Sequence, residues 1–444
     1  MPGPDSFGDL IAPFSRRGVD LGLKRLQAAL AELGHPERRF AAVQVAGTNG
    51  KGSISTMVER IASAAGIRCG LYTSPHLLSW CERIRLPGGL IAEAELRRLL
   101  EGLQPLALRH DLTPFELITA AAFQAFAEGG VDLAVLEVGL GGRLDATTVH
   151  PDRSVLALAS IGLDHTEHLG PTLAAIAAEK AGVLHAGAVA VSGPQAPEVA
   201  QVLMQQAQAL GCALRWVERL PVEAEGGPRL GLAGDLQRQN AAVALGVAQA
   251  LAERGWAIEP AAMARGLASA RWPGRLERRC FAGRPLLLDG AHNPPAADAL
   301  RLELDRWDRS DQDHGPGRDP LAPPARRWLV AIQRHKDAPQ LLGALLRAGD
   351  AVRVAALPEH HTWTAAELLA AGVGGDAVQL EAASGDAATD LAWLVASSAL
   401  PVACGSLYLV AELLPLLTAD PAAPAGTEAG AGVSAASAGA RATD

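Results

Sequence analysis

One short stretch constrains the fold of this chain more than any other: an apolar run that ends in a glycine-rich turn and continues as a helical pattern. The run covers residues 40–46, the turn covers residues 47–52, and apolar residues at helical spacing follow from Ser53. A strand, a glycine turn and a helix form a phosphate-binding loop, because backbone N–H groups and the helix N-terminus face an anion. Lys51 would reach the outer phosphates, and the Ser53 hydroxyl would ligate Mg²⁺. A glycine separates Lys51 from Ser53, unlike the usual GxxxxGK(S/T) pattern, and a plain glycine turn is the alternative.

The composition indicates a globular protein that acts on small molecules. Its 444 residues suit two or three domains, and 49% of them are apolar. The net charge of −9 argues against a nucleic-acid surface, and no apolar run reaches the roughly 20 residues of a membrane helix. Residues 1–13 lack the order of a signal peptide, and five scattered cysteines favour a reduced compartment and disfavour zinc. We therefore expect a cytoplasmic monomer with small-molecule substrates and no nucleic-acid or membrane partner.

Apolar runs of strand length alternate with helical patterns along most of the chain, which predicts an α/β fold. We expect a P-loop-containing, mostly parallel sheet domain over residues 1–272, with an N-terminal helix at residues 15–35. A Pro–Gly break near residue 273 marks the start of a smaller doubly wound, Rossmann-like α/β domain, expected over residues 273–418. Residues 419–444 are rich in Ala, Gly, Ser and Pro, and we expect them to be disordered.

Polar side chains follow several predicted strands, at the edge where parallel sheets bind ligands. Glu137 ends a nearly all-apolar strand, and a buried carboxylate is costly without a cation, which favours a Mg²⁺ ligand over a salt-bridged glutamate. Ser74 could add a second hydroxyl, although an ordinary turn is the commoner explanation. His165 follows another strand within a polar cluster that could equally be a loop. Lys180 lies in the last turn of a helix, where it suits the helix dipole, and spacing alone does not bring it to the metal.

Two other segments suggest substrate contacts. Thr113 and Pro114 start a helix, and Phe115 in its first turn either stacks on a planar ligand or has a structural role alone. Residues 82–86 alternate charged and apolar side chains, as an exposed strand does. The two arginines of this segment either hold a carboxylate from one strand face or form a solvated edge, and both interpretations stay open.

The second predicted domain opens with a strand that ends in a polar group. This strand ends at Asp289, and His292 follows just before a helix. Two polar side chains at one strand end predict contact with a nucleotide across a cleft between the domains. In the first domain Asn240 begins an alanine-rich helix, where a helix cap and an adenine contact are the alternatives.

Together these motifs resemble the folylpolyglutamate synthase and dihydrofolate synthase family, within the Mur ligase superfamily. The stretches that carry the resemblance are residues 47–53, 72–77, 137–147, 162–170, 179–182 and 289–294, with a further match at 405–408. The resemblance extends from about residue 17 to residue 417. Ordered motifs at family-like intervals are far more specific than any single motif.

The resemblance implies that ATP and Mg²⁺ bind between the domains. The residues implied to contact ATP are Thr48, Asn49, Gly50, Lys51, Gly52, Ser53, Asn240, Arg275 and Asp289. Ser53, Ser74 and Glu137 are implied to ligate one Mg²⁺, and His165 is implied to ligate a second.

The resemblance also implies three catalytic residues, Lys51, Lys180 and His292. Lys180 is implied to be carbamylated, which turns its cation into an anion that supports the second metal. The implied reaction begins when a substrate carboxylate attacks the γ-phosphoryl group of ATP. The amine of L-glutamate then displaces phosphate from the resulting acyl phosphate.

A pteroate pocket is implied as well. Its implied residues are Asp20, Leu21, Gly22, Leu23, Thr113, Pro114, Phe115, Glu116, Leu144, Asp145 and Ala146. Ser406 is more weakly implied as a glutamate contact. Residues 79–83 depart from the Arg-Tyr-x-Glu-Arg pattern common in the family, which bears on folate contacts and not on ATP chemistry. We expect a bifunctional enzyme that acts on dihydropteroate and on reduced folates.

Two alternatives differ in function. A related Mur-type ligase would act on another carboxylate, but such cell-wall enzymes carry a nucleotide-sugar domain before the P-loop, and 46 residues precede Gly47 here, against the roughly 100 of a typical domain. A non-catalytic nucleotide-binding protein would keep Lys51 and Ser53 but would not need Glu137 and Lys180 as well. Their joint presence favours catalysis.

Overall fold

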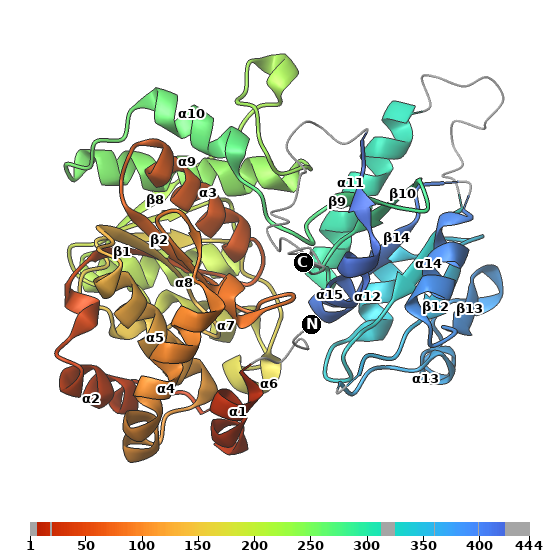
Figure 1. The fold of residues 1–444 in the computed structure, drawn as a ribbon. Coiled ribbons are helices and arrows are strands. Elements are labelled where there is room, and N and C mark those ends of the chain that lie inside the picture. The colour runs from red at the N-terminus through yellow and green to blue at the C-terminus, as the bar shows by residue number, and fades with distance from the viewer. Residues whose placement is uncertain (1–6, 18–19, 312–324, 359, 398, 422–444) are drawn as a thin grey trace, which may run out of the picture.

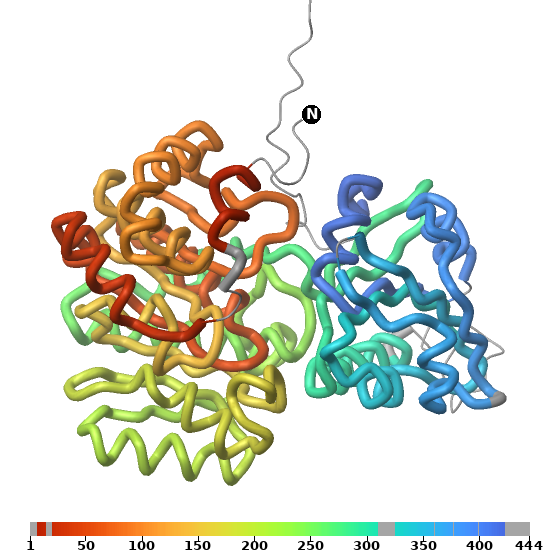
Figure 2. Tube along the Cα trace, turned by 90° about the horizontal axis from the view of Figure 1, so that it is seen from below, coloured from red at the N-terminus to blue at the C-terminus, as the bar shows by residue number. Residues whose placement is uncertain are grey.

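The computed structural model describes residues 7–17, 20–311, 325–358, 360–397 and 399–421. Two α/β domains lie side by side, the first drawn from red to green and the second from teal to blue (Figure 1). A view from below shows the same two lobes (Figure 2). The predicted fold class is therefore confirmed: a P-loop sheet domain precedes a smaller α/β domain.

The first domain is built on an eight-stranded sheet with the order β4-β3-β2-β5-β1-β6-β7-β8. Its strands are β1 (Ala41–Ala46), β2 (Cys69–Tyr72), β3 (Ile84–Leu86), β4 (Gly89–Leu90), β5 (Leu133–Glu137), β6 (Val155–Leu158), β7 (Val189–Ser192) and β8 (Ala213–Trp216). The neighbouring strands β2, β5, β1, β6, β7 and β8 run parallel to one another. At the β2 side, β3 and β4 extend the sheet as antiparallel strands. The carboxyl ends of β1, β2, β5 and β6 consequently meet at one edge, where α/β sheets bind ligands.

Helices cover both faces of this sheet, because successive side chains of a buried strand point to opposite faces. On β1, Val43 and Val45 pack toward one face, in a core with α3 (Lys51–Ala64), α9 (Leu236–Glu253) and α10 (Pro260–Ser269). Ala42 and Ala46 lie in two separate cores on the opposite face. The other helices of this domain are α1 (Gly8–Ile11), α2 (Lys24–Glu32), α4 (Glu93–His110), α5 (Pro114–Glu128), α6 (Thr166–Leu169), α7 (Leu173–Ala181) and α8 (Pro197–Leu210).

The second domain has a seven-stranded sheet with the order β13-β12-β11-β14-β10-β9-β15. Its strands are β9 (Glu277–Phe281), β10 (Arg284–Leu288), β11 (Arg327–Val330), β12 (Ala351–Val354), β13 (Gln379–Ala382), β14 (Val402–Cys404) and β15 (Thr418–Ala419). Its helices are α11 (Pro294–Asp311), α12 (Ala338–Leu345), α13 (Ala365–Ala370), α14 (Ala387–Val395) and α15 (Leu407–Leu413). The five strands from β13 to β10 are parallel, as a Rossmann-like domain requires, and β9 and β15 add an antiparallel edge.

Two predicted segments differ in detail. The helix expected over residues 15–35 is shorter, since α2 covers Lys24–Glu32 and a 3₁₀ turn at Ala12–Arg17 precedes it. The expected tail begins too early, because Ala419 pairs in β15 and buried Asp420 forms a 2.9 Å ion pair with Arg278. The remainder of that expected tail, residues 422–444, lies outside the described residues. Among the described residues, no helix is long and apolar enough to cross a membrane.

Candidate active site

The glycine turn after β1 forms a backbone cradle at the sheet edge. Its start is held by the end of β6, since the Thr48 N–H donates to the Ser160 carbonyl at 2.8 Å. Gly47 has a φ of +143°, and a Cβ there would lie 2.6 Å from the Ala159 Cβ, so only glycine fits. Helix α3 begins at Lys51, directly after the turn, and no side chain caps it. Its first N–H groups are therefore available to an anion, as the sequence predicts for a phosphate site.

The Lys51 side chain curls back over this turn. Its Nζ donates to the Thr48 carbonyl at 3.1 Å, and the Thr48 hydroxyl bonds to Gly162 at 3.1 Å. The ammonium group therefore sits at the mouth of the cradle. Ser53 is buried on the first turn of α3, two residues after Lys51.

Glu137 ends β5, which pairs with β1, so its carboxylate lies beside the glycine turn. The residue is 4% exposed, and its Oε2 has no hydrogen-bond partner among the described residues. Burial raises the pKa of this carboxyl to about 7, although Lys51 opposes the shift. A buried carboxylate oxygen without a partner fits a bound cation, and hydroxyl and carboxylate oxygens are ligands that Mg²⁺ prefers. The described residues contain no cluster of three or more His, Cys, Asp or Glu, so serine hydroxyls would have to complete this site.

Lys180 reaches the same turn, which spacing along the chain did not indicate. It is 4% exposed, and its Nζ donates to the Gly47 carbonyl at 2.8 Å. Burial, with Lys51 as a further cause, lowers the pKa of Lys180 to about 7. The end of α7, which carries Lys180, packs closely on the loop after β5. A Cβ on Gly182 would lie 2.3 Å from the Arg143 Cβ of that loop, so only glycine allows this approach. A substantial fraction of this amine is therefore uncharged near neutral pH.

Asp164, in the loop after β6, ties the second domain to this edge. The Asn293 Nδ2 donates to the Asp164 carboxylate at 3.0 Å, and the Asn293 and Asn49 amides exchange bonds of 3.0 and 3.1 Å. Lys336 forms an ion pair with Asp164 in which both side chains are 8% exposed. The His292 Nε2 lies 3.6 Å from the same carboxylate. The sequence analysis assigned no role to Asp164, Asn293 or Lys336, although the first two lie within motifs it recognised.

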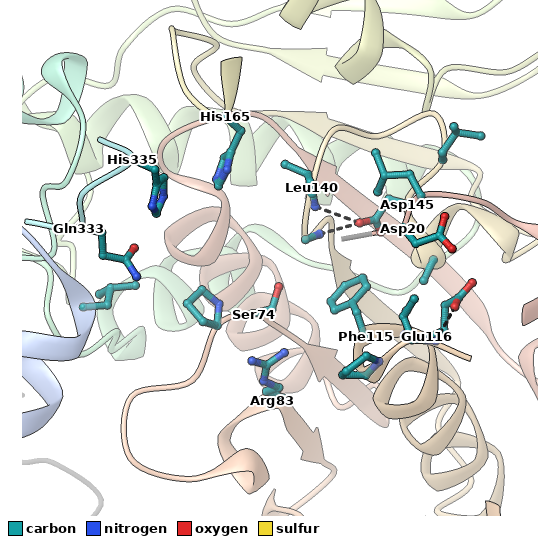
Figure 3. A pocket seen from close by; sticks show the side chains of 18 of the residues that line it. Asp20, Ser74, Arg83, Phe115, Glu116, Leu140, Asp145, His165, Gln333 and His335 are labelled. Atoms are coloured by element: carbon teal, nitrogen blue, oxygen red, sulfur yellow. Dashed lines mark hydrogen bonds between the residues drawn. The ribbon is translucent and has the colours of Figure 1, made fainter. Parts of the chain in front are cut away.

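A cavity of about 420 Å³ opens between the domains beside this edge, a volume typical of small-molecule sites (Figure 3). The predicted residues that line it are Asp20, Leu21, Gly22, Ser74, Thr113, Pro114, Phe115, Glu116, Leu144, Asp145, Ala146, His165, His292 and Ser406. The lining also includes Gln333, His335, Lys336 and Tyr408, for which no role was predicted, and Arg83, one of the two arginines for which a carboxylate site was left open. Leu23 is not part of the lining. The second domain therefore supplies one wall of the cavity, a contribution for which the sequence offered only Ser406 and His292.

The predicted nucleotide contacts surround the glycine turn from both domains. A Cβ on Gly50 would lie 2.5 Å from the Asn240 Oδ1, so this asparagine packs directly on the turn. The Asp289 carboxylate accepts the N–H groups of Leu276 at 2.9 Å and Ala291 at 2.8 Å. The same carboxylate lies within electrostatic reach of Arg275. Arg275 also acts on Glu137 through space, which relates this part of the second domain to the edge that carries the glycine turn.

Comparisons with known proteins agree with this arrangement. The family described as dihydrofolate synthetase, C-terminal domain, matches residues 281–416. A dihydrofolate synthetase of Saccharomyces cerevisiae is 32% identical over 430 residues, which cover 89% of this chain and 97% of the yeast protein. The chain belongs to the dihydrofolate synthase/folylpolyglutamate synthase family.

Solved structures of this family match along almost the whole chain. Escherichia coli FolC in complex with DHPP and ADP has a TM-score of 0.77 and 29% identity, and the match covers 94% of this chain and 99% of that one. A bifunctional folylpolyglutamate synthase/dihydrofolate synthase with Mn, AMPPNP and L-glutamate bound has a TM-score of 0.76 and 31% identity, with coverages of 93% and 98%.

Asp145 differs from the simple substrate contact that the family resemblance implies. Its carboxylate accepts the N–H group of Leu140 at 3.0 Å (Figure 3), those of Gly139 at 2.9 Å and Thr147 at 3.0 Å, and also the Thr147 hydroxyl. These four donors occupy the carboxylate, so in this structure it holds the glycine loop after β5. That loop in turn packs on Phe115, because a Cβ on Gly139 would lie 2.6 Å from the Phe115 ring. Asp145 therefore shapes the wall beside Phe115.

Proposed function

We propose that this protein is an ATP-dependent carboxylate–amine ligase that adds L-glutamate to dihydropteroate and to reduced folates. One observation carries the proposal. The glycine cradle, the unpartnered Glu137 oxygen and the folate-type cavity share a single sheet edge, and the second domain closes over it. These three features together suit a reaction that transfers a phosphoryl group to a small molecule held in the cavity.

The first step joins the acid to phosphate. The acid lies in the cavity against Phe115, and the N–H groups at the start of α3 hold the triphosphate. A carboxylate oxygen attacks the γ-phosphorus in line, the bond to the bridging oxygen breaks, and ADP departs from the acyl phosphate. Lys51 stabilises the negative charge on the transferred group because its ammonium already faces the turn.

The second step makes the amide. The amine of L-glutamate attacks the activated carbonyl, phosphate leaves, and the amine loses a proton. Ser406, buried on the second-domain wall, is the proposed glutamate contact. Water must be excluded because it would hydrolyse the acyl phosphate, and the contacts of Asp164 with Asn293 and Lys336 hold the second domain against the edge.

Ser53, Ser74 and Glu137 are the proposed ligands of one Mg²⁺, with His165 for a second. Burial lowers the pKa of His165 to about 4, so its imidazole is neutral and able to donate a lone pair. Magnesium would supply positive charge to the phosphate oxygens.

Carbamylation of Lys180 is part of the proposal. The uncharged amine attacks CO₂ and releases a proton, which leaves a carbamate anion beside the glycine turn. The lowered pKa of Lys180 supports this chemistry, since only the free amine is a nucleophile.

An ATP-turnover assay with and without dihydropteroate and L-glutamate tests the proposed function. We expect ADP formation to depend on both substrates, with one dihydrofolate made for each ATP consumed. Turnover that requires a muramyl substrate would instead favour the cell-wall ligase, and nucleotide binding without turnover would favour a non-catalytic protein.

The bifunctional assignment needs a separate comparison of product formed from dihydropteroate and from reduced folates. A product with dihydropteroate alone would restrict the protein to dihydrofolate synthase activity.

We also propose a cytoplasmic monomer. The five cysteines are buried and free, which supports a reduced compartment. Light scattering would test the monomeric state.

A further inference from the structure

Arg83 brings a positive charge to the cavity wall without a carboxylate to pair with it. It is the last residue of a 3₁₀ turn (Trp80–Arg83) and precedes β3, and its side chain is part of the cavity lining. Of the two arginines in residues 82–86, for which the sequence left a carboxylate site and a solvated edge open, Arg83 lines the cavity and Arg85 does not. Among the described residues, the Arg83 side chain makes a single hydrogen bond and no ion pair.

Two neighbours hold the guanidinium group in place. Its Nε donates to the His76 Nδ1 at 2.9 Å, and its Cζ lies 4.3 Å from the Trp80 ring centroid. Because a guanidinium nitrogen can only donate, the His76 Nδ1 is the acceptor of this bond. The Glu82 carboxylate fixes the turn itself by accepting the N–H groups of residues 77–79. Arg83 is thus positioned before any ligand arrives.

Within the part of the chain that the structure describes, neither terminal nitrogen of Arg83 has a hydrogen-bond partner. A guanidinium group offers two parallel N–H donors in the geometry that a carboxylate accepts. Arg25, near the same cavity, shows the contrast: its nitrogens are occupied by the carboxylates of Asp20 at 3.0 Å and Glu116 at 3.2 Å. Burial lowers the pKa of Arg83 below its usual range, which reflects the cost of a charge without a partner.

The position of Arg83 identifies which carboxylate it meets. Figure 3 shows it on the Ser74 side of the cavity, between the Phe115 end and the Gln333 end. Glu137, at the proposed metal edge, acts on Arg83 through space. An aromatic acid whose ring system lies against Phe115 would carry its acid group toward this point, next to the phosphate cradle.

We propose that the terminal nitrogens of Arg83 bind the carboxylate of the pteroyl substrate, the group that is to be phosphorylated, and that His76 and Trp80 are positioning residues for it. This inference rests on the proposed function and assigns the reacting end of the substrate. Free L-glutamate is the other source of a carboxylate in the reaction, and the test separates the two.

The decisive experiment compares binding of dihydropteroate with that of its uncharged carboxamide, in the absence of ATP. We expect the wild-type protein to prefer the acid by about 10- to 100-fold, as for hydrogen bonds to a charged group. Arg83→Gln should bind both compounds equally, and Arg83→Lys should keep part of the preference. Arg85→Gln is the matched control, since Arg85 lies two residues away but outside the lining, and it should behave as wild type.

The positioning residues are tested by the same ratio. His76→Phe and Trp80→Ala should lower the preference for the acid, whereas Trp80→Phe, which keeps an aromatic face, should restore most of it. A purely structural role would weaken binding of both compounds together. Thermal unfolding and ADP binding of each variant show whether it is folded.

Three results would overturn the assignment. Arg83→Gln could keep the preference for the acid, or lose affinity for acid and carboxamide equally. A raised KM for L-glutamate with the preference intact would place Arg83 at the amino acid instead. A wild-type protein that prefers the acid yet forms no product with L-glutamate would disprove the proposed function while Arg83 keeps its role. One that binds neither compound would disprove both.

Discussion

At the scale of single residues, the site depends on charged groups that are buried before any substrate is bound. Lys51, Lys180 and Glu137 lie around one glycine turn, and the pKa values of Lys180 and Glu137 are both shifted to about 7. Burial is the first cause of each shift, because removal from water penalises the charged form of an acid and of a base alike. Ionisable groups whose charged forms are destabilised by burial in the ligand-free protein are expected at sites where a bound ligand supplies a compensating charge.

Lys51→Ala should reduce turnover by at least about 1,000-fold, as loss of a cation that meets the transferred phosphoryl group does in related chemistry. The expected change is in kcat, with a smaller effect on the KM for dihydropteroate. Steady-state kinetics measure both. Near-normal turnover would contradict the phosphate role of Lys51.

Lys180→Ala should be nearly inactive and partly rescued by acetate or another short carboxylate. The small acid would occupy the space of the proposed carbamate and supply the negative charge that the carbamate would carry. Activity as a function of acetate concentration is the measurement, with added chloride as the control for ionic strength. Full activity without a carboxylate would return Lys180 to a structural role.

Lys180 also predicts a pH dependence of stability in CO₂-free buffer. Its folded-state pKa of about 7 lies below the ordinary lysine pKa of 10.5, so the unfolded chain binds more protons between these limits. The free energy of unfolding should therefore rise from pH 7 to pH 10.5, relative to Lys180→Met, and the difference should stay constant below pH 7. Urea titrations at several pH values check this, and a constant difference across the whole range would contradict it.

At the scale of the element, the start of α3 couples the phosphate cradle to the link between the domains. Gly52 lies in the first turn of α3, and a Cβ there would be 2.6 Å from the Trp272 Nε1. Trp272 precedes the Pro–Gly break that leads into the second domain. The glycine between Lys51 and Ser53, which departs from the usual P-loop pattern, thus makes room for an indole ring.

Gly52→Ala should weaken ATP binding and turnover on the order of 10-fold, even though alanine favours helices. The gain in helix propensity is about 1 kcal/mol, whereas overpacking a tight contact costs roughly 1–3 kcal/mol and here displaces Trp272. Gly102→Ala in α4 is the matched control, because nothing lies within 4 Å of its Cβ. Calorimetry of ADP binding measures the difference, and equal affinities would disprove the coupling.

At the scale of the whole molecule, three second-domain side chains meet one carboxylate of the first. Asp164 contacts Asn293, Lys336 and His292, and Lys336 also lines the cavity. The same contacts that hold the domains together therefore close the site against water. Domain closure and protection of the acyl phosphate are one structural feature here.

Asp164→Asn should open the molecule and uncouple ATP hydrolysis from amide formation. The amide can keep a bond to Asn293, but the buried Lys336 loses its counter-charge, which is strongly unfavourable. We expect a larger radius of gyration by small-angle scattering with nucleotide bound and more than one ATP consumed per product. Asp132→Asn, which breaks the exposed ion pair with Arg68, is the control. An unchanged ratio of ATP to product would contradict this role of Asp164.

The amino-acid sequence by itself determined the strands, the glycine turn and the order of the motifs. These are local features: apolar runs predict strands, glycine permits the backbone of the turn, and Thr113 with Glu116 forms the capping box that starts α5. Because the strands are parallel, their polar ends had to meet at one edge. That is why Glu137, Ser74 and Asp289 could be placed at a ligand site before the fold was seen.

Only the tertiary structure decided which distant side chains complete the site. Lys180 reaches the Gly47 carbonyl across 133 positions, and Lys336 reaches Asp164 across 172. The unused donors of Arg83 likewise become evident only when all of its neighbours are known. Helix packing and the docking of one domain on the other set these contacts, and neither periodicity nor spacing along the chain encodes them, because they depend on how whole elements are arranged in space.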